Sequence, residues 1–304
     1  MPEEGSPGNG GATPSRGPLG DVSAALAQTG LWLPWPEPLV VESTTSTMRD
    51  VQARAESGAA EGTVVIAEEQ TAGRGRHGRT WESARYAGLW LSLLLRPPDR
   101  AGIRATGENG TAGTSLGWLP LIVGLGVARG LRAVGAGDAV LKWPNDVLLP
   151  APASSPASSP ASSPASSPAS SPGKVAGILA ERLADGAVVV GMGINVDHAP
   201  DELPDTATSL RQQGFAGTRE SALVGVLVEV ARAYRAWAAG SAQREEYRRW
   251  CVTLGREVTA QGPAGPIAGL AADVDDWGRL HVIGRDGVET ALSAGDVAIV
   301  RPPW

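Results

Sequence analysis

The segment that most constrains this chain is Gln70–Trp81, in which glycines alternate with three arginines and one histidine. Its sequence is Gln-Thr-Ala-Gly-Arg-Gly-Arg-His-Gly-Arg-Thr-Trp. Glycine lets the backbone approach a ligand closely, consecutive N–H groups form anion-binding concavities, and a guanidinium matches two oxygens of a phosphate or carboxylate. The segment has too few apolar side chains to join a core, so we expect a surface loop that binds an anion. On these residues alone, a solvated basic loop or a nucleic-acid-binding tail is the alternative.

Two apolar runs flank this loop. Thr63–Ala67 is rich in β-branched residues and has the length of a buried strand, and Leu89–Leu95 is a second apolar run that ends before Pro97. We therefore predict that the loop bridges two core strands and is held on a rigid scaffold.

The rest of the first 250 residues alternates between helical and strand patterns. Thr47 is the expected N-cap of the first helix, and Asp185-Gly186 is the expected turn of a hairpin. The expected helices are Met48–Ser57, Leu119–Val134, Thr218–Ala239 and Gln243–Trp250, and the expected strands include 40–41, Val140–Trp143, 173–179 and 188–196.

Beyond Gly255 the pattern changes to short alternating strands separated by Gly and Asp. Five such strands in so short a stretch predict a small β-barrel. They are Glu257–Ala260, Ile267–Val274, Leu280–Ile283, Val288–Leu292 and Val297–Val300.

An Ala-Ser-Ser-Pro unit repeats five times from Ala153 to Pro172. Its side chains build no core and proline recurs at every fourth position, so we expect a disordered insert without a catalytic role. Lengthening a connection from roughly six residues to about 25 costs only on the order of 1.2 kcal/mol of closure entropy. The predicted organisation is a poorly ordered segment 1–38, a catalytic domain 39–252 that contains the insert 150–173, and a small domain 253–304.

Composition excludes several classes of protein. A net charge of −6 argues against a general nucleic-acid binder, which needs a broadly basic face. Cys251 is the single cysteine, so the chain has neither an internal disulfide nor a cysteine-based zinc site, and a buried apolar role is expected for it. Neither a secretory signal pattern nor a long membrane-spanning apolar run is present, and we expect a cytoplasmic protein that binds no membrane.

Four segments, in this order along the chain, resemble the biotin protein ligases. They are Ser46-Thr47-Met48, Gln70–Trp81, Lys142-Trp143-Pro144-Asn145-Asp146 and Lys174–Leu179, with support from 191–196 and 207–210. The resemblance extends over roughly 39–301 and implies an α+β fold. Its larger domain would be a mixed β-sheet with helices on one side, as in lipoate ligases, and its C-terminal domain an SH3-like β-barrel.

The resemblance also implies a reaction. Members of this family use ATP to convert biotin to biotinyl-5′-AMP and transfer the biotin to a lysine of an apo biotin carboxyl carrier domain. Mg²⁺ would accompany ATP, without a dedicated metal cage in the protein. The substrates would be biotin and ATP, and the protein partner a biotin-dependent carboxylase.

Residue roles carry over from the matching motifs. Lys174 and Arg76 would be the catalytic cations that neutralise carboxylate and phosphate oxygens. The biotin-binding residues would be Ser46, Thr47, Met48, Gln70, Arg74, Gly75, Arg76, Lys174 and Gly177. The nucleotide-binding residues would be Arg76, Trp81, Lys142, Asn145 and Asp146. Simpler roles stay open: Ser46 and Thr47 as helix caps, Lys174 as a solvated lysine, and Trp81 and Trp143 as core residues.

Two positions depart from the usual family pattern. His77 replaces an arginine, which lowers the fixed charge of the loop, and Met48 replaces the asparagine of many relatives. A lipoate-type ligase and a nucleic-acid-binding repressor are the alternative functions. The repressor is disfavoured because the sequence before Pro38 is too short for an N-terminal DNA-binding domain, so we expect the monofunctional type, as a monomer or a homodimer.

Overall fold

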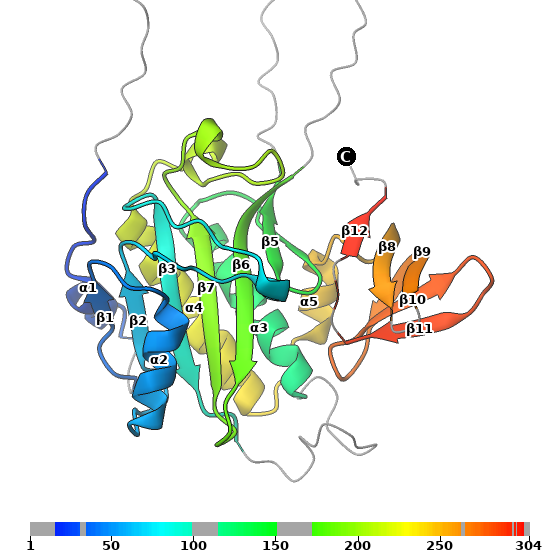
Figure 1. Cartoon of the computed structure of the whole chain (residues 1–304), viewed down its shortest axis with the longest axis horizontal. Coiled ribbons are helices and arrows are strands. Elements are labelled where there is room, and N and C mark those ends of the chain that lie inside the picture. Colours follow the sequence, from blue (N-terminus) through cyan, green and yellow to red (C-terminus); the bar gives the residue numbers. More distant parts are fainter. Residues whose placement is uncertain are drawn as a thin grey trace, which may run out of the picture.

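The computed structural model describes residues 16–30, 35–98, 115–150, 172–262, 265–293, 295 and 297–300. These residues form a seven-stranded mixed sheet and, beside it, a separate five-stranded antiparallel sheet (Figure 1). The α+β class and the small C-terminal β-domain are therefore confirmed. The insert expected at 150–173 lies, for residues 151–171, outside the described residues.

The larger sheet has the strand order β1-β2-β3-β7-β6-β5-β4, and β1 with β2 is its parallel pair. The strands are β1 (Leu39–Val41), β2 (Val64–Ala67), β3 (Gly88–Leu95), β4 (Val140–Lys142), β5 (Asp146–Leu149), β6 (Gly173–Arg182) and β7 (Val188–Asn195). The predicted strands on both sides of Gln70–Trp81, here called the Gly/Arg loop, are β2 and β3, which pair antiparallel. The loop therefore spans two neighbouring core strands.

Strand β3 is buried on both faces, as its continuous apolar run requires. Leu91 and Leu93 belong to the cluster shared with α3 (Leu119–Ala133) and α4 (Arg219–Ala238), whereas Leu94 packs in the second cluster with α2 (Thr47–Glu56). The expectation of helices on one side is thus wrong for α2, which covers the opposite face (Figure 1). Successive side chains of a strand point to opposite faces, so an all-apolar strand needs a cover on each.

Helices α3 and α4 pack closely because glycines in α3 leave room for the α4 backbone. A Cβ on Gly126 would lie 2.7 Å from Val230 Cα, and one on Gly130 would lie 2.6 Å from Val226 Cα. The expectation that no apolar run is long enough to span a membrane is wrong for Leu116–Ala133, which could cross one by length and composition alone. Of this stretch, 67% is buried inside the protein. Its hydrophobicity is accounted for by this packing between the sheet and α4.

Part of the N-terminal segment that we expected to be poorly ordered is a helix. Helix α1 (Val22–Thr29) begins at its N-cap Asp21, whose carboxylate accepts a hydrogen bond from Ala24 N–H at 2.9 Å. Val22 and Leu26 are buried in the main core, and α1 contacts α4. The expectation is wrong here because the helix is too short to be evident from its own pattern and depends on α4 for burial.

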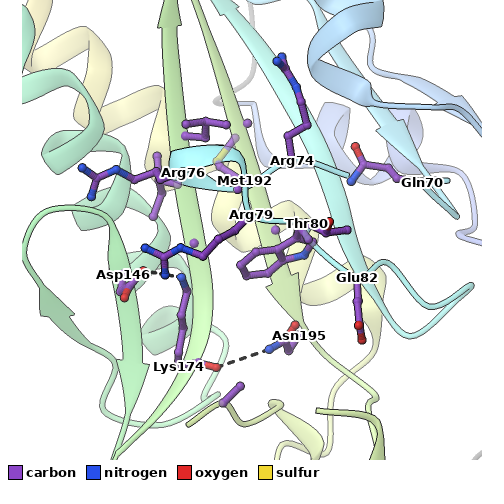
Figure 2. A pocket seen from close by; sticks show the side chains of 18 of the residues that line it. Gln70, Arg74, Arg76, Arg79, Thr80, Glu82, Asp146, Lys174, Met192 and Asn195 are labelled. Carbon is purple, nitrogen blue, oxygen red and sulfur yellow. Dashed lines mark hydrogen bonds and ion pairs between the residues drawn. The ribbon is translucent and has the colours of Figure 1, made fainter. Parts of the chain in front are cut away.

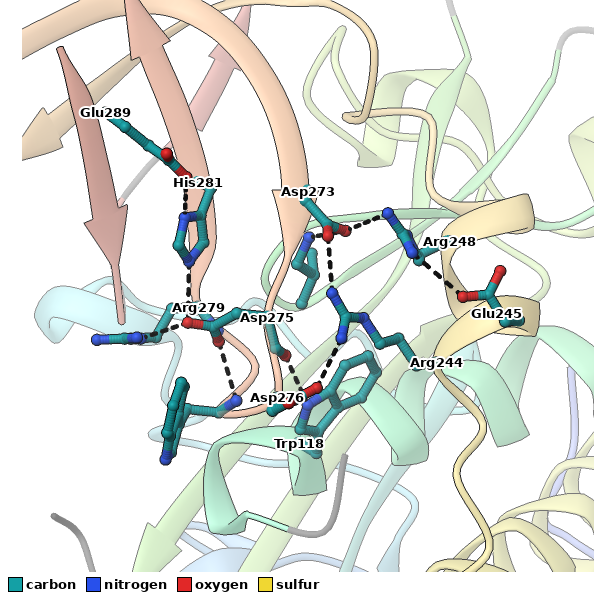
Figure 3. A network of polar contacts seen from close by, with 12 residues as sticks. Trp118, Arg244, Glu245, Arg248, Asp273, Asp275, Asp276, Arg279, His281 and Glu289 are labelled. Carbon is teal, nitrogen blue, oxygen red and sulfur yellow. Dashed lines mark hydrogen bonds and ion pairs between the residues drawn. The ribbon is translucent and has the colours of Figure 1, made fainter. Parts of the chain in front are cut away.

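The C-terminal sheet consists of the five predicted strands, in the order β11-β10-β9-β8-β12. They are β8 (Glu257–Gly262), β9 (Gly265–Val274), β10 (Leu280–Gly284), β11 (Glu289–Leu292) and β12 (Val297–Ile299). A polar network docks this sheet on α5 (Arg244–Trp250) and on the residues before α3 (Figure 3). Arg244 pairs with Asp273 at 2.7 Å and with Asp276 at 2.6 Å, and Trp118 Nε1 donates to the Asp275 carbonyl at 3.0 Å.

Candidate active site

A cavity of about 600 Å³ opens on the α2 side of the larger sheet, beneath the Gly/Arg loop (Figure 2). Its walls come from the start of α2, the loop, β6, β7 and the segment that follows β7. All nine residues assigned to biotin by resemblance line it, as do Trp81, Asn145 and Asp146. The fold therefore brings together twelve side chains or glycines from four separate sequence motifs.

One end of the cavity is a buried polar slot. Gln70 Oε1 accepts hydrogen bonds from the Thr47 backbone N–H at 2.9 Å and from Thr47 Oγ1 at 3.1 Å, and Thr47 Oγ1 lies 2.8 Å from Ser92 Oγ. Gln70 Nε2 donates to Ser83 Oγ at 3.1 Å. Ser46 is the N-cap of α2, without a side-chain cap bond, and Thr47 is the first helical residue, so the expected cap at Thr47 is shifted by one. The Thr47 hydroxyl is used for the slot instead of the helix end.

The floor of the cavity is made of glycines that face the Trp81 indole. A Cβ on Gly193 would lie 2.5 Å from Trp81 Cε2, and one on Gly177 would lie 2.9 Å from Trp81 Cζ3. Gly177 and Gly193 are paired across β6 and β7. Glycine is required at both positions because any side chain would displace the ring that closes the cavity from above.

Lys174 lies at the other end, close to a carboxylate. Its Nζ is 2.6 Å from Asp146 Oδ1 and 5.2 Å from the centre of the Trp81 ring, and both charged side chains are partly exposed. The ammonium is thus oriented by one anion and one aromatic face while it still reaches the cavity. A plain solvated role for Lys174 does not fit these contacts.

The arginines of the loop point in different directions. Arg76 Nη1 donates to Asn145 Oδ1 at 2.9 Å and to the Gly295 carbonyl of the C-terminal sheet region at 3.2 Å. Arg74 pairs with Glu181 at 3.1 Å on the outer side (Figure 2). Arg79, which we did not select from the sequence, also lines the cavity and extends toward Asp146 in the same view.

The loop is folded as a short hairpin over the cavity. Gly75 N–H donates to the Arg79 carbonyl at 2.7 Å, and Trp81 N–H donates to the Gly73 carbonyl at 2.9 Å. His77, at the exposed tip, has φ 55° and ψ 33°, a left-handed conformation in which histidine is enriched. His77 is not among the lining residues, so the departure from the family pattern at this position falls outside the cavity.

Lys142 and Trp143 do not line this cavity. Lys142 lines a neighbouring hollow of about 390 Å³ between the β4–β5 turn and the C-terminal sheet, which shares Arg79, Asn145 and Asp146 with the main cavity. Trp143 is 1% exposed, and its Nε1 donates to the Gly278 carbonyl at 3.0 Å. Of the two roles left open for Trp143, the core role is the one that this geometry supports.

Several lining residues were not found from the sequence. Ser92, Asn195 and His198 are buried beside the cavity, and Glu202 is exposed at its edge. Burial lowers the pKa of His198 to about 4, so its imidazole, whose ring centre is 5.7 Å from that of Trp90, is neutral at pH 7. Asn195 Nδ2 donates to the Thr208 carbonyl at 3.1 Å. Only the Gly-x-Gly-x-Asn pattern at the end of β7 offered a signal for Asn195.

Comparisons with known proteins agree with this geometry. Residues 40–197 match the model of the biotin/lipoate A/B protein ligase family, and residues 253–300 match that of the biotin protein ligase C-terminal domain. A biotin–[acetyl-CoA-carboxylase] ligase of Mycobacterium tuberculosis is 36% identical over 293 residues, or 94% of this chain and 97% of that protein. The bifunctional ligase/repressor BirA of Bacillus spizizenii is 30% identical over 84% of this chain and 71% of that protein.

The solved structures give the same result. The biotin protein ligase of Aquifex aeolicus in complex with biotin and ATP superimposes with a TM-score of 0.66 at 27% identity, over 87% of this chain and 98% of that chain. The family matches cover both sheets, and the cavity holds the motifs that carry the resemblance. The chain therefore belongs to the biotin/lipoate A/B protein ligase family, and within it this enzyme is a biotin protein ligase.

Proposed function

We propose that this enzyme activates biotin as biotinyl-5′-AMP and transfers the biotin to a lysine of an apo biotin carboxyl carrier domain. The observation that carries the proposal is the placement of Lys174 and Asp146, 2.6 Å apart, beneath the Gly/Arg loop at the end of the cavity opposite the polar slot. A cation at this point would lie where two anions, a carboxylate and a triphosphate, have to meet.

The reaction would proceed in two displacements. A biotin carboxylate oxygen attacks the α-phosphorus of ATP, the bond to the β-phosphate oxygen breaks, and pyrophosphate leaves. The deprotonated carrier lysine then attacks the carbonyl carbon of the anhydride, an amide forms, and AMP leaves. No bond to the enzyme is needed, so positioning and charge stabilisation supply the catalysis.

Each end of the cavity fits one substrate. The slot of Thr47, Gln70 and Ser92 offers hydroxyl and amide groups for a small polar ring, and the glycine floor with Met48 gives the apolar space that rings and an alkyl chain need. We assign Arg76, Asn145 and Trp81 to the nucleotide side. The hairpin loop above them would keep water from the anhydride.

Metal and partners follow from the same chemistry. Within the ranges that the structure describes, no three His, Cys, Asp or Glu side chains are grouped so as to hold a metal ion. Mg²⁺ is therefore proposed to enter with the phosphates of ATP, which it prefers over all-protein cages. The partner would be a biotin-dependent carboxylase, and we place the reaction in the cytoplasm.

The decisive experiment is incubation of the full chain with ATP, biotin and an apo carrier domain, followed by an avidin blot. Labelling that depends on both ATP and biotin is expected, with biotin-dependent exchange of labelled pyrophosphate into ATP. A parallel reaction with lipoate and an apo lipoyl domain tests the alternative. Lipoyl labelling without biotin labelling would overturn the proposal.

A further inference from the structure

Residues Arg16–Gly20, here called the N-terminal strap, connect two parts of the molecule that border the cavity. One is the root of the Gly/Arg loop, at Glu68, and the other is the segment 197–208 after β7, here called the wall segment. The strap precedes α1, the dark blue helix labelled in Figure 1. No sequence motif pointed to it.

The strap is anchored on a buried ion pair. Glu68 and Arg219 contact each other with side chains only 2% and 5% exposed. Leu19 N–H donates to Glu68 Oε1 at 2.5 Å, and Arg219 Nη1 donates to the Gly17 carbonyl at 2.8 Å. A buried ion pair is stable only when its remaining donors and acceptors are bonded, and the strap backbone provides two of these bonds.

From this anchor, Arg16 reaches the wall segment. Its Nη1 donates to Glu202 Oε1 at 2.8 Å, its Nη2 contacts Glu202 Oε2, and Nη2 also donates to the Asp197 carbonyl at 2.6 Å. The bond from Arg16 lowers the pKa of Glu202 to about 2, so both partners are charged at neutral pH. In the described parts of the chain, this is the one ion pair that reaches the middle of the wall segment, residues 199–205.

The other end of the wall segment is bonded to the backbone of Lys174. Lys174 N–H donates to the Thr206 carbonyl at 2.9 Å, and Thr208 N–H donates to the Lys174 carbonyl at 3.0 Å. Between these bonds and Arg16, the residues Asp201, Leu203 and Pro204 line the cavity. The position of this wall is therefore fixed at Lys174 on one side and by Arg16 on the other.

We propose that Arg16 is a positioning residue for the reaction: through Glu202 it holds the wall segment against the Lys174 end of the cavity. It touches no reacting atom. Because this end lies opposite the Thr47–Gln70 slot, Arg16 favours binding of the nucleotide over that of biotin. The inference rests on the proposed function for the identity of the nucleotide.

The test is Arg16→Gln in the full chain, with biotin-dependent pyrophosphate exchange measured against ATP and biotin. The KM for ATP is expected to rise about fivefold, which corresponds to about 1 kcal/mol for a partly exposed ion pair. The kcat and the KM for biotin change less than about twofold. Hydrogen exchange of 199–205 is expected to become faster, a readout that does not depend on activity.

Three further variants separate positioning from general stability. The control Arg232→Gln removes an ion pair with Glu229 on α4, away from the strap. It should change neither the KM for ATP or biotin nor the hydrogen exchange at 199–205. The reversal Arg16→Glu with Glu202→Arg should recover much of the KM for ATP, and Arg16→Lys should give an intermediate value. Two results for Arg16→Gln would overturn the inference. One is an unchanged KM for ATP together with unchanged hydrogen exchange at 199–205. The other is an equal rise in the KM for ATP and the KM for biotin together with a lower Tm. If the wild-type enzyme is inactive, the proposed function is rejected. Hydrogen exchange at 199–205 then still decides whether Arg16 holds the wall segment.

Discussion

Lys174 Nζ lies 2.6 Å from Asp146 Oδ1, across the antiparallel pair of β5 and β6. The two residues come from different motifs, separated in sequence by the Ala-Ser-Ser-Pro insert, and meet because the strands that carry them are neighbours. The carboxylate holds the ammonium at the end of the cavity opposite the polar slot. This ion pair therefore fixes the position of the ammonium in the cavity.

Lys174→Met is expected to reduce kcat for pyrophosphate exchange by about 10²–10³-fold, because one preorganised cation is lost from the developing charge. Arg182→Met, at the exposed far end of the same strand, is the control and should keep wild-type rates. Pyrophosphate-exchange assays at saturating ATP and biotin measure the kcat of each variant. A Lys174→Met enzyme with more than about a tenth of the wild-type kcat would contradict the role of Lys174.

Gly193→Ala is expected to raise the Kd for biotin about tenfold or more, since its methyl group would lie 2.5 Å from Trp81 Cε2 and force the indole out of position. Isothermal titration with biotin measures the change directly. In the control Gly124→Ala, the new methyl group would meet nothing closer than 3.7 Å, and binding should not change. Equal affinities in the two variants would show that Trp81 does not shape the cavity.

The glycines of α3 are expected to differ in their effect on stability. Gly124→Ala should stabilise the protein by about 0.5–1 kcal/mol, because alanine is the better helix former and the methyl group has space. Gly126→Ala should destabilise it by about 1–3 kcal/mol, because the methyl group would lie 2.7 Å from Val230 Cα. Urea unfolding of both variants gives the comparison, and a stabilising Gly126→Ala would refute this account of the α3–α4 contact.

Deletion of Ala153–Pro172 is expected to leave biotin transfer intact. Leu149 and Gly173 are already paired across β5 and β6, so the ends that the insert connects lie side by side. The three residues 150–152 would remain as the connection, within the usual length of a hairpin loop. Avidin blots of the deletion variant and the full chain make the test, and loss of labelling in a folded deletion variant would assign the insert a role.

The docking of the C-terminal sheet is expected to depend on pH through His281. Burial alone would lower the pKa of His281, but contacts with Asp275 at 2.9 Å and with Glu289 outweigh it and raise the pKa above 6.5 (Figure 3). The stabilisation is therefore complete below pH 6.5 and is lost as pH rises through the higher pKa of the folded state. It amounts to about 1 kcal/mol at most, because the network contacts solvent.

His281→Gln should flatten the dependence of Tm on pH between about 6 and 9. The same scan on Arg285→Gln, an exposed arginine of the C-terminal sheet region, should match wild type. A wild-type Tm that does not fall over this range would argue against the network.

Much of this protein was determined by local sequence. The β-branched run before Gln70 and the leucine run after Trp81 fixed two core strands, because continuous apolar residues of strand length are buried on both faces. The motifs around Thr47, Gln70, Asn145 and Lys174 together indicated the family and twelve of the residues that line the cavity. Such information is local, since glycine, proline and charge patterns act over a few positions.

Tertiary structure alone decided the rest. Arg16 and Glu202 are 186 positions apart, and neither belongs to a pattern that predicts the other. Likewise, α2 covers the second face of the sheet, Trp143 lies in the core instead of the cavity, and His198 is buried and neutral beside Trp90. These features arise where segments from distant parts of the chain meet, and the burial and charge that define them exist only after the sheet has formed.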